Sequence, residues 1–500
     1  DRSRATAADI ASLGASLVID AAGPFQGADL SFARACISAG VDYLDLSDAR
    51  DFVAAFPSLD AEARTQNVRA ITGASSTPAL THAALDQLTK GWRRIDMVRA
   101  GISAGNRAPR GLSMIEAILS WTGAPVRVFE GRQWITRAGW SRTFSHALPG
   151  IGRRSFALAE TPDLDLIPAR FSPCEDGVFT AGLELGVMHR GMSVVGGLRR
   201  IGLLKDLRPL AGLLQNLAML FAAFGTDRGC MFVEACGRDA ENNPVRTEWT
   251  LVAPPVEGPF TPTLPALVLA RQLIASRNLG PGARACAGIL SLDDLQSDFA
   301  RHGLTTEITL ERLTGAFELA LGKDFGRLPE IVRESHRQGR VARFRGTARV
   351  DGPAWLAMLP AFLFGLPRSA RAAPVEVEKR LVAGGREIWK RNIGGSLFRS
   401  EITYVRPGRV RERFGPFSFD LDVAADERRH TMTIAGWRFG PIPLPRVLAP
   451  KSTAIEAASD DGVFTFDVPV VLPLAGRLTR YKGELRLLGA AEPQKQAQAT

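Results

Sequence analysis

Three apolar runs near the start of the chain alternate with segments of helical periodicity. The runs are Leu17–Asp20, Val41–Asp48 and Val68–Gly73, and each leads into small or polar residues. Between the first two runs, Leu30 and Ile37 recur at a spacing that places them on one face of a helix. Strands that alternate with helices of this length are typical of right-handed βαβ units. The pattern therefore predicts a parallel sheet in this part of the chain.

The turns that follow these strands are candidate binding positions, because ligands of such sheets bind outside the carboxyl ends of the strands. The first turn holds Gly23, which allows close backbone approach to a ring, and Pro24, which fixes the turn. Phe25 is expected to offer an apolar wall. The alternative is that this turn only packs on its own helix.

Polar residues in the two later turns have two interpretations each. Asp48 is placed to accept a substrate proton, to bind a cation, or to cap the next helix. Ser75, Ser76 and Thr77 are helix N-cap material whose N–H groups are also placed to cradle an anion. If Gly73 were replaced by a branched residue, its side chain is expected to project toward the ligand pocket at the ends of the strands.

In order and spacing, the segments "VIDAAGPFQGADLSFARACISAGVDYLDLSD" and "ITGASSTPAL" resemble the saccharopine dehydrogenase-like family of NAD(P)-binding oxidoreductases. The resemblance implies NAD or NADP as cofactor and a small-molecule substrate, and it names no catalytic residue. It implies a nicotinamide pocket edged by Ala22, Gly23, Pro24, Phe25, Ser47, Asp48, Gly73, Ala74 and Ser75. The family's glycine fingerprint has no counterpart here, and the chain opens without Met. We therefore expect the first strands of this domain to be missing and the cofactor to bind poorly.

A second region has the sequence pattern of a mixed sheet. The segments "IDMVRAGISAG" and "RVFEGRQWITRAG" predict strands around a helix over 112–120, and "RDAENNP" predicts the turn of a hairpin. An amphipathic helix is expected to begin near Pro265. This arrangement resembles the family's second domain, which covers the cofactor and supplies the substrate cleft. The candidates for cleft residues are Trp134, Trp140, Arg246 and Trp249, and the alternative is that the tryptophans belong to the core.

The segment 196–225 is apolar and helical. Its uncharged part, 209–224, is shorter than the ~20 residues that a bilayer crossing needs. One expectation is a buried or dimer-forming helix. The other is peripheral membrane contact by an interfacial helix whose basic residues lie near phospholipid heads: Arg199, Arg200, Lys205 and Arg208.

The C-terminal region begins with a predicted helical segment over 313–337 and continues as strands. The connections "AGG", "RPGR", "AADE" and "SDDG" are hairpin signals, so an antiparallel sheet or partial barrel is expected. The region resembles an uncharacterised bacterial domain. Six aromatic residues are candidates either to line an apolar cavity or to fill it: Trp389, Phe398, Phe414, Phe417, Trp437 and Phe439. The short apolar segment 355–366 is placed to lid a cavity or to touch lipid.

Composition narrows the function classes. The 500 residues are 45% hydrophobic and 23% charged, which is typical of a globular chain with several cores. The net charge of +10 reflects genome bias or an acidic partner. The sequence has no arginine cluster interleaved with aromatic residues, so nucleic-acid binding is not predicted. The five scattered cysteines indicate reduced thiols in a cytoplasmic protein. The absence of a CxxC pair and the wide spacing of the six histidines predict no metal site.

Together these patterns predict an α/β plus β protein. Residues 1–92 are expected to form a partial Rossmann-like NAD(P)-binding domain, 93–310 an α+β substrate domain, 311–489 an antiparallel β domain, and 490–500 a disordered tail. The resemblance implies an oxidoreductase. The alternative is a lipid or small-ligand binding protein that uses a degenerate nucleotide-binding fold as a scaffold.

Overall fold

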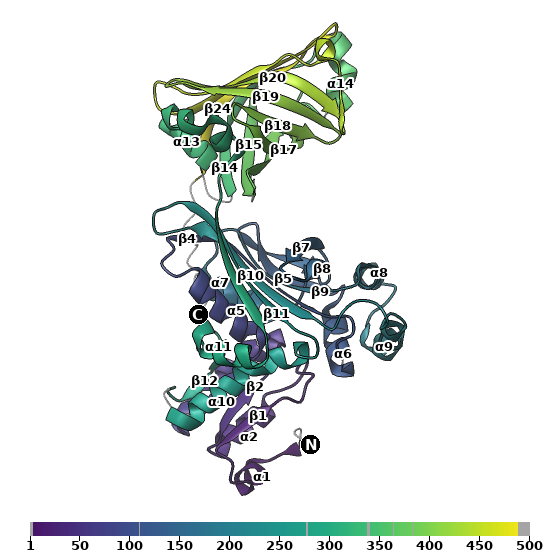
Figure 1. Cartoon of the computed structure of the whole chain (residues 1–500), viewed down its shortest axis with the longest axis vertical. Coiled ribbons are helices and arrows are strands. Elements are labelled where there is room, and N and C mark those ends of the chain that lie inside the picture. Colours follow the sequence, from purple (N-terminus) through teal and green to yellow (C-terminus); the bar gives the residue numbers. More distant parts are fainter. Residues whose placement is uncertain are drawn as a thin grey trace. The chain divides into compact units, whose positions relative to one another are not determined.

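The computed structural model describes residues 4–109, 111–276, 279–337, 341–363, 365–382 and 384–488. The chain divides into two compact units, one formed by Asp1–Ala235 with Thr247–Leu310 and the other by Cys236–Arg246 with Glu311–Thr500. Figure 1 traces the elements of both units. The division into three domains stays a prediction, and the expected tail over 490–500 lies outside the described residues.

The first unit contains a parallel sheet whose strands lie in the order β1-β2-β3-β12. Their bounds are β1 (Leu17–Asp20), β2 (Asp42–Asp45), β3 (Arg69–Thr72) and β12 (Gly282–Ala285). All three pairings are parallel, which confirms the predicted sheet. Strand β12 was not predicted, because its four residues "GARA" contain no apolar run.

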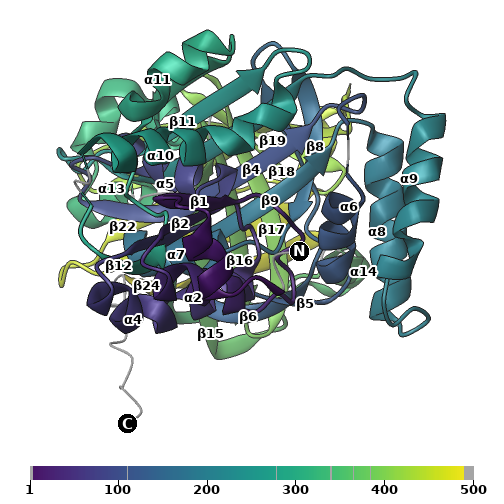
Figure 2. The same ribbon diagram turned by 90° about the horizontal axis from the view of Figure 1, so that it is seen from below.

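Helices cover both faces of this sheet. Successive residues of a strand point to opposite faces, and Tyr43 packs in one hydrophobic core while Leu44 packs in another. The first core is formed with α2 (Ser31–Ser38), α3 (Arg50–Ala55), η2 (Phe56–Leu59) and α4 (Asp60–Thr65), next to which lies α1 (Ala7–Ser12). The second is formed with η3 (Ser76–Leu80), α5 (Thr81–Leu88), α10 (Leu264–Ser276) and α11 (Leu292–Arg301). Figure 2 shows α2 and α10 lying over these strands.

A nine-stranded mixed sheet completes the core of the first unit. Its path is β13-β11-β10-β4-β9-β5-β6; off this path, β8 pairs with β9, and β7 pairs with β8. The strands are β4 (Arg94–Ala104), β5 (Pro125–Glu130), β6 (Gln133–Ala138), β7 (Phe144–Leu148), β8 (Gly152–Leu158), β9 (Asp176–Leu183), β10 (Gly229–Arg238), β11 (Pro244–Ala253) and β13 (Thr305–Arg312). Its helices are α6 (Leu112–Trp121), α7 (Asp163–Phe171) and η5 (Gly258–Thr263). The predicted helix over 112–120 and the hairpin β10–β11 are confirmed.

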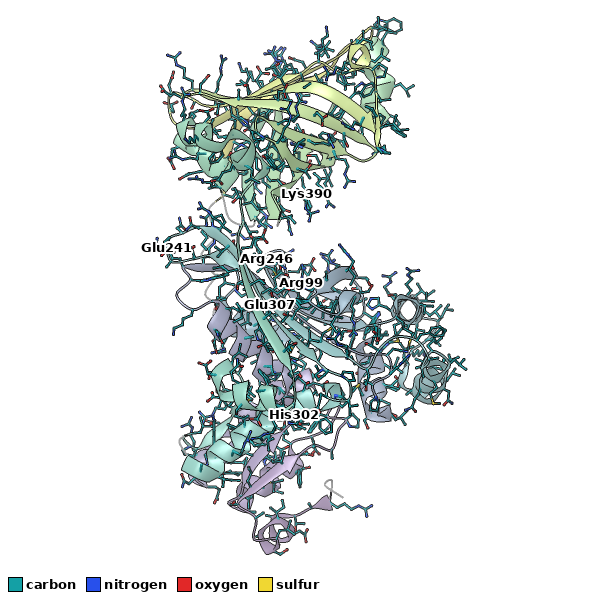
Figure 3. All side chains as sticks on the ribbon, in the orientation of Figure 1. Arg99, Glu241, Arg246, His302, Glu307 and Lys390 are labelled. Atoms are coloured by element: carbon teal, nitrogen blue, oxygen red, sulfur yellow. The ribbon has the colours of Figure 1, made fainter. Side chains whose placement is uncertain are left out.

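The four predicted cleft residues of this sheet lie in different surroundings. Trp140 and Trp249 are buried in the core, which confirms the alternative interpretation of these two tryptophans. Trp134 is half-buried against Phe129, with ring centroids 5.7 Å apart. Arg246 lies on β11 (Figure 3) with its Nη1 atom 3.9 Å from Glu311 Oε2.

The predicted apolar helix over 196–225 is two shorter helices. Helix α8 (Gly186–Arg200) is followed by η4 (Arg208–Leu210) and α9 (Ala211–Leu220). Burial is a wrong expectation for most of this segment. Leu207 and Ala211 are buried in a small core with Leu119, and Leu204, Leu210 and Leu214 pack against it partly buried. Apolar side chains such as Leu220 (72% exposed) face outward. Within the described residues, no helix combines the length and the apolar character that a membrane crossing requires.

The second unit is a closed antiparallel barrel of ten strands, in which β19 pairs with β20 to complete the ring. The strands are β14 (Val341–Asp351), β15 (Ala370–Val382), β16 (Arg386–Ile393), β17 (Ser396–Arg406), β18 (Arg409–Phe414), β19 (Phe417–Ala425), β20 (Arg429–Phe439), β22 (Thr453–Ala458), β23 (Phe464–Leu472) and β24 (Gly476–Leu487), with β21 (Ile442–Pro443) beside β20. The predicted hairpins are confirmed, and the ring is fully closed. Alternate residues face outward, where ion pairs such as Lys390 with Glu378 occur (Figure 3).

Short helices lie at both ends of the barrel (Figure 1). At one end are α12 (Ala316–Leu321), η6 (Gly322–Arg327) and α13 (Glu330–Arg337), which confirm the predicted helical segment over 313–337. At the other end are η7 (Trp355–Ala357) and α14 (Met358–Leu363), which contact β24 near its start. We call these the α13 end and the α14 end. A further short helix, η8 (Arg446–Leu448), lies in the loop that links β21 to β22.

Candidate functional site

The turn after β1 is the most open of the three predicted binding turns. Ala22, Gly23 and Pro24 are exposed, and the Ala22 N–H donates to Asp20 Oδ1 at 3.0 Å. A Cβ atom added at Gly23 would meet only the Phe25 ring, at 4.0 Å. A ligand can therefore approach the Gly23 backbone closely.

Phe25 itself turns away from this open edge. It is 5% exposed and packs edge-to-face against Phe52, with ring centroids 5.3 Å apart. Its ring belongs to the core with Phe56. Phe25 therefore supports the turn from beneath, and the expected apolar wall facing a ligand is not formed by this side chain.

Asp45, which the sequence analysis did not single out, connects the second and third turns. Its Oδ1 atom accepts hydrogen bonds from Ser47 N–H (2.9 Å), Gly73 N–H (2.7 Å) and the Thr72 hydroxyl (2.9 Å). Burial raises the pKa of Asp45 to about 6, although the bonds from Gly73 and Ser47 oppose the rise. One carboxyl group thus fixes the backbone of both turns.

The second turn divides into a buried and an exposed residue. Ser47 is buried, and its hydroxyl accepts from the Ala49 N–H at 3.2 Å. Asp48 is exposed and accepts from the Gln26 amide at 3.0 Å. The expected helix cap by Asp48 is wrong, because α3 begins after Ala49 without a side-chain capping bond. The Asp48 side chain instead bridges to the loop after the first turn.

The third turn is buried. Gly73, Ala74 and Ser75 lie under η3, which contacts α7, α10 and η5. Ser75 makes no side-chain capping bond, so the expected N-cap role is wrong. A Cβ atom at Gly73 would lie 2.6 Å from Pro78 Cδ, which corrects the expectation that it would project toward a pocket. The third turn therefore does not face solvent; it supports the carboxyl edge of the parallel sheet from within.

A polar pocket of about 400 Å³ adjoins the first two turns. Its lining comprises Gln26, Gly27, Ala49, Arg50, Asp51, Ser120, Trp121, Glu160, Arg199, Lys205, Asp206 and Arg208. The nine predicted site residues are not in this lining, but Gln26 follows Phe25 and Ala49 follows Asp48 directly. Sequence reasoning missed the pocket, because its residues come from segments up to about 180 positions apart.

The charged side chains of the pocket are held in place by the fold. Arg50 donates from Nε to Asp165 Oδ2 at 2.6 Å and from Nη1 to the Arg127 carbonyl at 2.7 Å. Arg199 donates from Nη1 to the Ser120 and Thr122 carbonyls at 2.8 and 3.1 Å. Arg199 therefore caps the end of α6 and does not extend freely toward lipid, as the interfacial-helix interpretation required.

A second cavity, of about 390 Å³, lies inside the barrel. Five of the six predicted aromatic residues line it: Trp389, Phe398, Phe414, Phe417 and Trp437. Phe439 is 49% exposed and is not in the lining. The interpretation that these residues fill the barrel is therefore wrong, and the interpretation that they line a cavity holds for five of them.

Buried ionisable residues gather at the α13 end of this cavity. His336 Nε2 and His430 Nδ1 lie 2.7 and 3.1 Å from Glu456 Oε2, and Lys379 Nζ lies 3.7 Å from Glu456 Oε1. Although burial alone would raise the pKa of Glu456, Lys379 and His336 hold it well below its usual range. Burial lowers the pKa of His336 to about 4. The two histidines and Glu456 have the spacing of metal ligands, but the Lys379 ammonium already compensates the carboxylate.

The fold and these two sites define a two-unit protein, with a parallel α/β edge in one unit and a hollow antiparallel barrel in the other. Residues 328–485 match the model of a domain of unknown function, DUF4166. This match fits the expected uncharacterised domain in the C-terminal region. No curated protein matches the chain.

Solved structures with some likeness to this chain include three of low identity. Saccharopine dehydrogenase (L-Glu forming) from Saccharomyces cerevisiae is 10% identical over 62% of this chain and 88% of that one, with a TM-score of 0.45. A protein of unknown function from the DUF3598 family of Nostoc punctiforme is 10% identical over 52% and 67%, with a TM-score of 0.22. GenD2 from gentamicin A biosynthesis, solved in complex with NAD, is 13% identical over 46% and 54%, with a TM-score of 0.20.

Proposed function

We propose that the first unit binds NAD or NADP at the carboxyl edge of its parallel sheet and transfers hydride between the nicotinamide ring and a small-molecule substrate. The observation that carries the proposal is the exposed turn at Gly23, which lies at this edge beside the polar pocket. Open parallel sheets bind their ligands in the crevice outside the carboxyl ends of their strands. The motif resemblance around Gly23, Ser47 and Gly73 gives independent support.

In this proposal, the residues of the edge differ in their roles. Gly23 and Pro24 offer backbone that a planar ring can approach, and Asp48 offers a carboxylate at the rim. Asp45 acts as a positioning residue, since it holds Ser47 and Gly73 through its Oδ1 atom. Hydride chemistry is supplied by the nicotinamide when it is bound.

The polar pocket suits the charged part of such a ligand. Four cationic side chains (Arg50, Arg199, Lys205 and Arg208) and three acidic ones (Asp51, Glu160 and Asp206) line it. Arg50 and Arg199 are held by the hydrogen bonds described above, so binding there would cost little side-chain ordering. We assign this pocket to phosphate groups of the cofactor or to a polar substrate.

The test is a fluorescence titration of NADH and NADPH against the full chain and against Gly23→Leu. The added side chain would occupy the open space above the turn, so cofactor affinity should fall on the order of tenfold or more while the circular dichroism spectrum is unchanged. Gly280→Leu is the matched control: Gly280 is exposed, a Cβ there meets nothing within 4 Å, and it lies at the opposite end of the sheet. Equal affinities for all three proteins would refute the proposed site.

A second function is favoured by a different observation. The barrel cavity has walls that are mainly apolar, which is typical of sites that bind small apolar molecules. Binding there requires no cofactor and is independent of the first unit's chemistry.

A further inference from the structure

The barrel cavity is apolar, and its charges are already paired. Lys379 lies 3.7 Å from Glu456, and Arg391 lies 3.0 Å from Glu412. These two cations and two carboxylates are the Lys, Arg, Asp and Glu side chains of the lining. An ionised ligand would have to displace a paired partner, which is costly in a buried site. The cavity therefore suits a neutral molecule.

Three hydroxyl-bearing residues lie in the lining of the cavity: Ser452, Thr479 and Tyr481. Thr479 is 1% exposed and lines the cavity, and its Oγ1 atom has no hydrogen-bond partner among the described residues. The matching ligand class is a neutral molecule that is mainly apolar.

Exposed apolar side chains of the barrel unit gather at the α14 end. They are Trp355, Leu356, Met358, Leu359, Phe362, Leu397, Phe439, Ile442, Val447, Leu448, Val471 and Leu474. Trp355 and Phe362 are 78% and 82% exposed. The remaining large apolar side chains that are exposed in this unit, among its described residues, are only 37–39% exposed and lie elsewhere: Leu319, Tyr404, Val405 and Leu488. An apolar surface of this extent marks an interaction site.

The charge of the α14 end identifies what it contacts. The loops at this end (352–369, 394–395, 415–416, 440–452 and 473–475) contain no Asp or Glu, but they contain Arg368, Arg446 and Lys451, all exposed. Loops at the α13 end contain Asp426, Glu427, Asp460 and Asp461. Bulky exposed apolar side chains, in loops whose charged residues are all cationic, complement an anionic lipid surface.

The exposed surface and the cavity are separated only by the residues that pack under α14. Ala357 and Ala361 pack against Leu478, and Leu366 and Leu472 pack against the same cluster. Leu366, Leu472 and Leu478 also line the cavity. We propose that the α14 end of the barrel docks on an anionic lipid membrane and that the cavity takes up a neutral apolar molecule there.

Flotation of the full chain with vesicles tests the docking. Binding to phosphatidylcholine vesicles should increase when phosphatidylglycerol is added. Trp355→Ser combined with Phe362→Ser should weaken that binding on the order of tenfold or more. Arg368→Glu combined with Arg446→Glu should remove the dependence on phosphatidylglycerol.

The matched control for docking is Leu203→Ser combined with Leu220→Ser, which removes two apolar side chains of similar exposure (69% and 72%) from the first unit. This control should float like the unsubstituted chain. Loss of flotation in the control alone, or no flotation of the unsubstituted chain, would overturn the proposal. So would a dimer that Trp355→Ser and Phe362→Ser dissociate without vesicle binding, because the α14 end would then be a protein interface.

Fluorescent probes test the ligand class in the same protein. The neutral probe N-phenyl-1-naphthylamine should bind and accept energy from Trp437, and Trp437→Phe should lower that transfer. Parinaric acid, which carries a carboxylate, should bind on the order of tenfold more weakly. Ser452→Trp should narrow the cavity and weaken probe binding; if that variant does not fold, the result with Trp437→Phe decides. Equal binding of both probes, or transfer unaffected by Trp437→Phe, would contradict a neutral ligand inside the barrel.

Discussion

At the residue scale, Asp45 is the position where burial and function are most closely linked. Its raised pKa means that, from about pH 4 to about pH 6, the folded chain keeps a proton that the unfolded chain has lost. The contribution of Asp45 to stability therefore falls as the pH rises through this window. The whole effect amounts to about 3 kcal/mol.

Asp45→Asn should remove this pH dependence, because the amide oxygen can still accept the bonds from Ser47, Gly73 and Thr72 but carries no charge. The unfolding free energy of the variant should rise relative to that of the unsubstituted chain as the pH increases from about 4 to about 6. Urea denaturation at a series of pH values measures this difference. Parallel pH profiles would show that Asp45 does not hold its raised pKa.

Glu456 provides a second prediction at this scale. Glu456→Gln leaves the buried Lys379 ammonium without its counterion, and the loss of stability should be about 3–5 kcal/mol. Combining it with Lys379→Met removes both charges and should recover much of that loss. Denaturation followed by the fluorescence of Trp389 measures both. If the double variant is no more stable than Glu456→Gln, the two groups are not a coupled pair.

The predicted site residues show which properties of a single residue can be predicted from the sequence. The positions of Gly23, Ser47 and Gly73 at strand ends follow from local pattern, and the structure places them there. Their exposure does not follow from local pattern, because helices α7 and α10 from later in the chain cover the third turn. Asp45 was not predicted as a site residue, because the sequence pattern of an acidic residue at the end of a strand is that of a solvent-facing residue.

At the element scale, α12 closes the α13 end of the barrel with Phe317. This ring is 1% exposed and lies 4.9 and 5.0 Å from the ring centroids of His336 and His430. Phe317→Ala should destabilise the barrel by about 3–5 kcal/mol, because the cavity that it leaves cannot collapse between closed strands. Leu319→Ala, on the same helix but 39% exposed, should cost less than about 1 kcal/mol. Similar losses of stability for both variants would mean that α12 does not close the α13 end of the barrel through Phe317.

The strands of the barrel were predictable element by element, but its closure was not. Hairpin turns and alternating residues are local signals, and they gave the strands from β14 to β24. The ring closes through the pairing of β19 with β20, which is another hairpin, and through β14 with β24, which are more than a hundred residues apart. Only the second pairing distinguishes a barrel from an open sheet, and no local pattern encodes it.

At the scale of the whole molecule, the two units differ in the chemistry of their pockets. The first unit offers an open backbone turn beside a polar pocket with four cationic and three acidic side chains, and the second offers an apolar cavity with paired charges. Composition averaged over 500 residues conceals this contrast, since the net charge of +10 fits both units. The sequence motifs marked the turns that adjoin the polar pocket, whereas the barrel cavity depends on the closed ring of strands.

The central claim is that a nicotinamide cofactor binds at the Gly23 edge of the first unit. Hydrogen exchange of the full chain, measured by mass spectrometry with and without saturating NADPH, locates the contact directly. NADPH should slow exchange in 21–27 and 46–51, which carry the first two turns and adjoin the polar pocket, and should leave the barrel strands unchanged. Protection confined to other segments, or none at saturating NADPH, would contradict it.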